Sequence, residues 1–348
     1  MIPKPATIQD VARAAGVSPA TVSRALSNPD ILAEKTREAV FEAITNTGYR
    51  VNQAARNLRM QRAGAVLILV PNLGKPFYSK ILSGLSDGFS GTDYAVLIAD
   101  TESRPLEDGE LAGYFTDGRI DGVVCLDGGL SPEALQQCKR QGLGEKIVFL
   151  CEWVEDVDVP IISVDNSEGA RLAVEHLYQL GHRAIAHVAG PEGNVLTTAR
   201  RDGMTNECAR LGLPVHDDWM IPGDFSVESG HAAARAILAM PQATGTARPT
   251  AVFCSADTVA FGLISGLQAG GLSVPGDISV VGFDDIDISQ YYIPALTTIR
   301  QDRHRLGFQA AECLLERLKP SRTQPDGTAS NTIDVELVVR DSTAPPPV

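Results

Sequence analysis

The chain has 348 residues and a net charge of −13, with 44% hydrophobic and 21% charged residues, which is typical of a globular protein and excludes a fibrous or disordered chain. Its six cysteines are too few and too widely spaced for a disulfide scaffold, and its apolar runs are too short to cross a bilayer. The N-terminal residues lack the apolar segment of a signal peptide, so we expect a cytoplasmic protein with no membrane partner.

The charge is unevenly distributed along the chain. Residues 1–62 contain nine lysines and arginines but only five acidic residues, a net +4, so the remaining residues carry −17. A basic segment on an acidic body is expected when only that segment meets phosphate groups. Charge differences of this size between segments also occur in proteins that bind no nucleic acid, so charge alone does not decide whether the protein binds DNA.

The N-terminal segment predicts three short helices. Thr7 is a candidate N-cap of the first helix, with Asp10 three residues later as its capping partner. Ser18 can cap a second helix, because Pro19 follows it at the first helical position, where a missing N–H costs nothing. The third helix is expected from about residue 33 to residue 47.

Two helices joined by a tight turn that contains glycine make a helix-turn-helix motif, whose second helix enters the major groove of DNA. The outward positions of the second helix offer one guanidinium for a base, hydroxyls for phosphates and small apolar groups for thymine methyls. With the two N-cap residues, the candidate DNA contacts are Thr7, Ser18, Pro19, Ala20, Thr21, Ser23 and Arg24. A structural cap of three helices explains the helix pattern equally well.

The order of the residues is more specific than the helix pattern. Residues 7–26, TIQDVARAAGVSPATVSRAL, resemble the DNA-binding headpiece of the LacI (lactose repressor) family of bacterial transcription regulators. The resemblance continues through residues 48–58, which in that family form a hinge helix whose leucine wedges into the minor groove of a palindromic operator. Val51 stands where the family usually has proline. The hinge residues that match DNA contacts are Asn52, Ala55 and Leu58.

From residue 65 the chain alternates short apolar runs with helical segments, which predicts parallel sheets covered by helices on both faces. The remaining length is too great for one sheet, so two lobes are expected. The resemblance to the LacI family extends over almost the whole chain. It implies an α/β core of the periplasmic-binding-protein type, in which two doubly wound lobes clamp a ligand at the carboxyl ends of their strands.

The expected organisation is therefore an all-α helix-turn-helix headpiece followed by the α/β core. We place the headpiece at residues 1–49, the hinge helix at 50–62, the ligand-binding core at 63–340 and a tail at 341–348. Lobe 1 is expected to comprise about 63–162 and 293–322, and lobe 2 about 163–292 and 323–340.

The sequence lacks the motifs of common enzyme classes. It has no GxxxxGK[ST], GxGxxG or HExxH, and its six histidines are scattered, so no metal and no cofactor are expected. Asp284 and Asp285 follow a predicted strand and could form a carboxylate pair for acid–base catalysis. Adjacent side chains point apart, however, and a carboxylate that accepts a hydrogen bond from a ligand hydroxyl is the better interpretation.

Candidate effector contacts follow from the resemblance. Arg200 matches the arginine of the family's R-x-x-G, Asp284 its conjugate carboxylate, and Phe225 an aromatic that stacks on the ligand ring. Asp257 matches the aspartate of an Asn-Asp pair, but Ala256 replaces the asparagine, which puts a standard hexose in doubt. The remaining candidates are Phe77 and Tyr78 from the first lobe and Glu152, whose segment is similar to that of the cytidine repressor branch. Core packing explains each of the three aromatic side chains equally well.

The sequence therefore predicts a ligand-responsive DNA-binding transcriptional repressor, with no enzymatic activity. The resemblance implies a homodimer on double-stranded operator DNA, with a sugar or a nucleoside as small-molecule effector. The residues after Arg340 do not supply a leucine heptad, so we expect a dimer and not a tetramer. A solute-binding protein of a transporter and an α/β enzyme acting on sugars or nucleosides are the alternatives.

Overall fold

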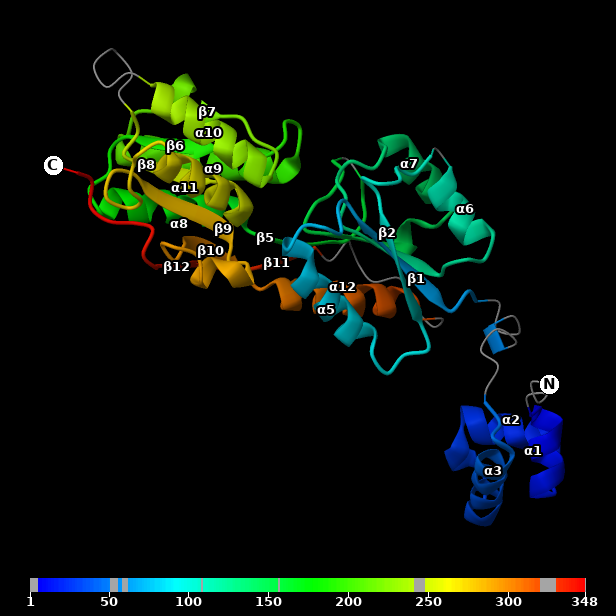
Figure 1. The fold of residues 1–348 in the computed structure, drawn as a ribbon. Helices are drawn as coiled ribbons and strands as arrows, with labels where there is room; N and C mark the ends of the chain where they lie inside the picture. The colour runs from blue at the N-terminus through cyan, green and yellow to red at the C-terminus, as the bar shows by residue number, and fades with distance from the viewer. Residues whose placement is uncertain are drawn as a thin grey trace. The chain divides into compact units, whose positions relative to one another are not determined.

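The computed structural model describes residues 6–50, 56–57, 62–107, 109–155, 157–240, 248–319 and 330–347. The chain divides into two compact units, Met1–Ala63 and Gly64–Val348. The described part of the first unit is helical, whereas the second unit contains two six-stranded sheets with helices around them (Figure 1). Within the described ranges, no helix combines the length and the hydrophobicity that crossing a bilayer requires.

The N-terminal unit contains α1 (Ile8–Ala15), α2 (Pro19–Ser27), the short 3₁₀ helix η1 (Pro29–Ile31) and α3 (Glu34–Thr47). The predicted capping box is confirmed, because the Asp10 N–H donates to the Thr7 hydroxyl (3.4 Å) and the Thr7 N–H donates to the Asp10 carboxylate (3.0 Å). Ser18 caps α2 with Pro19 at its first position, also as predicted. The three helices bury a small core of Val11, Ala12, Val22, Ala25, Val40 and Ala43.

The predicted hinge falls largely outside the described residues. Arg56 and Asn57 are helical, and the Asn57 amide donates to the Ala63 carbonyl (3.0 Å). The candidate contacts Asn52, Ala55 and Leu58 lie outside the described residues, so their expected roles remain predictions.

The second unit has two sheets, as expected from the alternation of apolar runs and helices. The first sheet has the strand order β11-β5-β4-β3-β1-β2, and the second has the order β12-β10-β9-β8-β6-β7. Neighbouring strands run parallel in both sheets, except for the antiparallel pair of β10 and β12 at one edge. The strands of the first sheet are β1 (Ala65–Val70), β2 (Ala95–Asp100), β3 (Gly122–Cys125), β4 (Ile147–Leu150), β5 (Ile161–Val164) and β11 (Asn331–Ile333). Those of the second are β6 (Ile185–Val188), β7 (Met220–Ile221), β8 (Ala251–Cys254), β9 (Ser279–Asp284), β10 (Thr297–Gln301) and β12 (Val335–Val338).

Helices cover both faces of each sheet, because nearly every strand residue near the sheet centre is apolar and must be shielded from water. In lobe 1, α5 and α12 pack on one face of the first sheet, and α6 and α7 pack on the other (Figure 1). In lobe 2, α10 and α11 cover one face of the second sheet, and α8 and α9 cover the other. The helices of lobe 1 are α5 (Phe77–Phe89), α6 (Glu110–Thr116), α7 (Pro132–Arg140) and α12 (Arg303–Arg317). Those of lobe 2 are α8 (Asn166–Gln179), α9 (Val195–Leu211), α10 (Val227–Ala239) and α11 (Asp257–Ala269), and short 3₁₀ helices occur at η2 (Gly144–Lys146), η3 (Asp217–Trp219) and η4 (Asp287–Gln290).

The expected lobe boundaries are wrong near the C-terminal end. Residues 293–322 were expected in lobe 1, but β10 belongs to the second sheet, where it lies in parallel register with β9. Residues 323–340 were expected in lobe 2, but β11 pairs in parallel with β5 of the first sheet. The chain therefore passes between the lobes three times, after β5, after β10 and after β11.

Helices α5 and α12 are in direct backbone contact in lobe 1. A Cβ atom on Gly84 would lie 2.0 Å from the His304 carbonyl oxygen, and one on Gly307 would lie 2.1 Å from the Ile81 carbonyl oxygen. Only glycine permits this approach, so α12 is fixed against α5 although it follows a strand of lobe 2.

The segment after Arg340 was expected to be a tail, but residues 341–347 pack on lobe 2. The fully buried Ser342 hydroxyl donates to the Val280 carbonyl (2.6 Å) and accepts the Thr297 N–H (2.8 Å). His182 contacts the Ala344 carbonyl (2.8 Å). These contacts satisfy backbone groups at the amino ends of β9 and β10, which makes the segment part of the lobe.

Candidate functional site

Helix α2 has one buried face and one exposed face. Val22 and Ala25 are fully buried in the core of the N-terminal unit. The side chains expected to contact DNA lie on the other face: Ser18, Pro19, Ala20 and Arg24 are exposed, and Thr21 and Ser23 are partly exposed. The exposed face carries the guanidinium and the hydroxyls that the major groove and its phosphates require.

Three of the candidate hydroxyls also stabilise the helix starts. The exposed Thr7 hydroxyl donates to the Asp10 carboxylate (2.7 Å), and the hydroxyls of Ser18 and Thr21 lie 2.9 Å apart. These residues stand at helix N-termini, where the partial positive charge of the helix favours an approaching phosphate.

A pocket of about 770 Å³, including its open mouth, lies between the two lobes. It sits at the carboxyl ends of the parallel strands, the place where sheets of this kind bind ligands. Lobe 1 supplies Pro71, Lys75, Phe77, Tyr78 and Glu152. Lobe 2 supplies Pro191, Asn194, Leu196, Arg200, Phe225, Ala256, Thr258, Asp284 and Ile286.

The guanidinium of Arg200 is buried and fixed from several sides. Its Nε donates to the Asn166 side-chain oxygen (2.9 Å), and its Nη1 donates to the Ser255 carbonyl. The guanidinium carbon lies 3.8 Å from the centroid of the Phe283 ring, and burial lowers the pKa of Arg200. A cation held this way is oriented before any ligand arrives, and it presents one fixed polar surface to the pocket.

Two carboxylates from opposite lobes face the same pocket. Asp284 of lobe 2 accepts from the Gln301 amide (2.7 Å), and burial raises its pKa while Arg200 opposes that rise. Glu152 of lobe 1 accepts from the Gly128 N–H (3.2 Å), and burial raises its pKa as well. Both carboxyls retain acceptor capacity, so the pocket suits a ligand that carries several hydrogen-bond donors.

Backbone strain is concentrated at this pocket. Among the described residues, Cys151, Phe225, Asp284 and Asp285 adopt a positive φ without being glycine, at 67°, 63°, 117° and 50°. Such conformations cost of order 1–3 kcal/mol each and gather where a side chain must be aimed. A Cβ atom on Gly190 would lie 2.3 Å from the Phe225 ring. The position of this ring in the pocket wall therefore requires glycine at residue 190.

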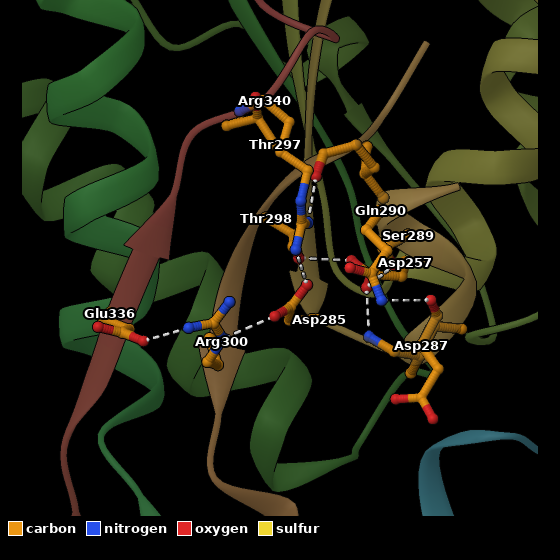
Figure 2. A network of polar contacts seen from close by, with 12 residues as sticks. Asp257, Asp285, Asp287, Ser289, Gln290, Thr297, Thr298, Arg300, Glu336 and Arg340 are labelled. Carbon is orange, nitrogen blue, oxygen red and sulfur yellow. Dashed lines mark hydrogen bonds and ion pairs between the residues drawn. The ribbon is translucent and has the colours of Figure 1, made fainter. Parts of the chain in front are cut away.

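The expectation that Asp257 contacts the effector is not supported, because its side chain lies beside the pocket and not among the lining residues. One carboxylate oxygen accepts from the Ile286 N–H (2.9 Å) and the Ser289 hydroxyl (2.6 Å), and the other accepts from the Thr298 hydroxyl (2.5 Å) (Figure 2). Its neighbours Ala256 and Thr258 line the pocket instead. Asp257 thus anchors the segment that follows Asp284, and burial raises its pKa.

The structure brings together Phe77, Tyr78, Glu152, Arg200, Phe225 and Asp284, as the sequence predicts. It adds lining residues that motif matching missed, of which Lys75, Asn194 and Thr258 carry polar groups. Asn194 caps α9 by accepting from the Leu196 N–H (2.9 Å), directly after the loop that follows β6. The rule that ligands bind at strand ends would have pointed to it.

The described residues contain no group of three or more histidine, cysteine, aspartate or glutamate side chains that could hold a metal ion.

Comparison with known proteins places the chain in a family. Residues 7–52 match the model of the "Bacterial regulatory proteins, lacI family", and residues 174–343 match a "Periplasmic binding protein-like domain". The HTH-type transcriptional repressor CytR of Escherichia coli (strain K12) is 35% identical over 338 residues, which cover 97% of this chain and 96% of that protein. The HTH-type transcriptional repressor PurR of Actinobacillus pleuropneumoniae serotype 3 (strain JL03) is 33% identical over 320 residues, 92% of this chain and 93% of its own.

A solved structure agrees with these relatives. The crystal structure of the Lac repressor dimer bound to operator and the anti-inducer ONPF matches with a TM-score of 0.81 and 28% identity, and the match covers 98% of this chain and 100% of that one. The headpiece match separates the chain from solute-binding proteins, which share only the core fold. The chain belongs to the LacI family of bacterial regulatory proteins and is a ligand-responsive, DNA-binding transcriptional repressor.

Proposed function

We propose that the protein acts in the cytoplasm as a homodimer on a palindromic operator and that a sugar or nucleoside effector binds in the interlobe pocket. The observation that carries this proposal is the convergence of Arg200, Asp284 and Glu152, from both lobes, on one pocket that also contains Phe77 and Phe225. A pocket with a few convergent polar groups among apolar walls is the common form of a small-molecule site.

The exposed face of α2 supports the DNA part of the proposal. Arg24 reads a base edge in the major groove, and the hydroxyls at the starts of α1 and α2 hold phosphates. By resemblance to the family, Asn52, Ala55 and Leu58 supply the minor-groove contacts at the centre of the operator.

The pocket supports an effector with a flat ring and a polar edge. Phe77 and Phe225 offer aromatic faces from opposite lobes, while Arg200, Asp284 and Glu152 offer one donor and two acceptor groups. Hydroxyl and amine groups of a sugar or a nucleoside satisfy both kinds of partner. Ala256, where the resemblance leads us to expect an asparagine, removes one hydroxyl partner from the wall.

Exposed apolar side chains support the homodimer. Edge strand β2 of the first sheet exposes Val96, Leu97 and Ile98, and lobe 2 exposes Tyr291 and Ile293, which are 73% and 84% exposed. An apolar edge strand is a hazard unless another chain covers it, and a two-fold partner would also match a palindromic operator. The structurally similar Lac repressor is a dimer on its operator.

A thermal-shift screen against sugars and nucleosides tests the effector site. A ligand present at 100 times its Kd adds about 2.7 kcal/mol to the stability of the wild-type protein. Arg200→Ala removes a charged donor, so we expect ligand affinity to fall about ten- to a hundredfold, equivalent to about 1.5–3 kcal/mol. Arg201→Ala, which removes a half-exposed arginine outside the pocket, serves as the matched control and should keep the full shift. An equal shift in wild type and Arg200→Ala would place the effector elsewhere.

A further inference from the structure

Arg303 joins the two lobes through a nearly buried guanidinium. It is the first residue of α12 in lobe 1, and only 3% of its side chain is exposed. Its Nη1 donates to the carbonyls of Pro76 (3.5 Å) and Phe77 (3.4 Å), both in lobe 1. Its Nη2 donates to the Asp285 carbonyl (3.0 Å) and the Asp287 carboxylate (3.4 Å), both in lobe 2.

The Asp287 carboxylate receives a second cation from lobe 1. Lys80, on α5, lies 2.5 Å from the Asp287 carboxylate, which also accepts from Arg303. The two cations hold the pKa of Asp287 below its usual range, with the hydrogen bond from Lys80 as the largest cause. A carboxylate of lobe 2 thus stands between two cations of lobe 1.

The contacts of Arg303 and Lys80 with Asp285 and Asp287 form a bridge between the lobes. Both ends of this bridge are attached to rigid parts of the molecule. On the lobe 1 side, Gly307 and Gly84 hold α12 in backbone contact with α5. On the lobe 2 side, the Asp285 carboxylate accepts from Arg300 (2.6 Å) and Arg340 (2.7 Å), and Arg300 also contacts Glu336 (Figure 2). A change in the bridge is therefore transmitted to the lobes and is not absorbed by a loose loop.

The bridge also lies next to both walls of the pocket. Phe77, whose carbonyl it binds, lines the pocket from lobe 1. Asp285, whose carbonyl it binds, directly follows Asp284, which lines the pocket from lobe 2. The Arg303 guanidinium thus contacts a pocket residue itself on lobe 1, Phe77, and the residue next to a pocket residue on lobe 2, Asp285.

We propose that Arg303, Asp287 and Lys80 form an interlobe latch that sets the separation of the pocket walls and so acts as a group of positioning residues for the effector site. The regulatory role rests on the proposed function, whereas the latch itself acts in the ligand-free protein. Releasing it would favour a more open arrangement of the lobes, and the effector would have to work against that shift when it closes the pocket.

Trp153 provides a reporter of lobe opening. Together with Gly128 and Gly129 of lobe 1, it lines a hollow of about 420 Å³ whose opposite side is formed by residues 192–195 of lobe 2. The other tryptophan, Trp219, is 3% exposed in the core of lobe 2. Quenching by acrylamide in the ligand-free protein therefore reports mainly Trp153, and Trp153→Phe gives the contribution of Trp219.

The test compares acrylamide quenching in wild type, Lys80→Met, Asp287→Asn and Arg303→Met. We expect the open population to rise by about two- to fivefold on loss of the Lys80 pair, as for an ion pair of ordinary surface strength. Sodium chloride should increase quenching of the wild type through screening and have little effect in Asp287→Asn. Glu175→Gln is the matched control, because it breaks an ion pair with Arg171 of 2.7 Å that lies within α8 of lobe 2, away from the latch and its attachments.

Lys80 is half-exposed, so Lys80→Met is expected to fold even where Arg303→Met does not. Wild-type quenching in Lys80→Met and Asp287→Asn, with unchanged melting temperatures, would overturn the latch, as would equal opening in Glu175→Gln. Because no effector is present, a negative result here differs from a failed thermal-shift screen, which would contradict the proposed effector site and leave the latch intact.

Discussion

The guanidiniums of Arg24 and Arg200 have opposite surroundings, and these surroundings suit them to different ligands. Arg24 is exposed on α2, so its guanidinium is hydrated in the free protein. It would be dehydrated only on contact with a base edge in DNA. Arg200 is already desolvated, hydrogen-bonded to Asn166 and stacked on Phe283. It therefore loses little side-chain entropy when a small ligand binds.

At the residue scale, Arg24→Ala should weaken binding to a palindromic operator selected from random DNA by about 1–3 kcal/mol and relax selectivity at one position of each half-site. The measurement is a competition titration against operators that carry each base at that position. Arg13→Ala is the control, because it removes an exposed arginine of the same unit that lies on α1. Unchanged selectivity in Arg24→Ala would show that another side chain reads the base.

His187 makes stability depend on pH in a predictable direction. Its ring is fully buried in β6, lies 2.9 Å from the Phe253 carbonyl and stacks on the Phe253 ring, and burial lowers its pKa to about 4. The unfolded chain takes up the proton near pH 6.5, before the folded protein does, so the stabilisation present above that pH is lost as the pH falls towards 4.

Replacing His187 by leucine removes this titration. Between pH 7 and pH 4 the wild type should lose about 3 kcal/mol more unfolding free energy than His187→Leu, as a shift from 6.5 to about 4 implies. Urea unfolding at the two pH values measures the difference, and the buried carboxyls of the pocket titrate alike in both proteins. Parallel pH profiles would mean that His187 is solvated or charged in the folded state.

At the scale of the element, the starts of the first two headpiece helices were predictable because the capping signals are local. Thr7 with Asp10, and Ser18 with Pro19, lie within one turn of the backbone groups that they satisfy. The strand β10 was not predicted, and residues 293–322, which contain it, were expected in lobe 1. The assignment of β10 to the second sheet depends on its pairing with β9, and the sequence of β10 alone does not indicate that partner.

The candidate site likewise contains residues that the sequence located and one, Asp257, whose surroundings it could not predict. Strand ends and motif matches located Arg200, Phe225 and Asp284, because these positions follow from the order of strands and turns. Asp257 matched its motif equally well, but its oxygens are taken by groups from Ile286, Ser289 and Thr298. Those partners lie 29 to 41 residues away in the chain, so only the folded structure reveals that the carboxylate is occupied.

At the scale of the whole molecule, the division of charge matches the division of labour. The basic first 62 residues contain the helix proposed to contact DNA, whereas the acidic remainder contains the pocket and two lobes joined by three crossings. The acidic body repels phosphate, so we expect DNA contact to be confined to the headpiece and the hinge. A ligand can change operator affinity only by the difference between its affinities for the two arrangements of the lobes.

Fluorescence anisotropy of a labelled palindromic operator, titrated with and without the compound that gives the largest thermal shift, tests this coupling most directly. We predict that the saturating ligand changes the operator Kd of the wild type by about 5–150-fold, the usual range of coupling between two sites. Arg200→Ala should bind the operator with wild-type affinity and respond only at about ten- to a hundredfold higher ligand concentration. An operator Kd that stays constant while the ligand stabilises the wild-type protein would contradict the account.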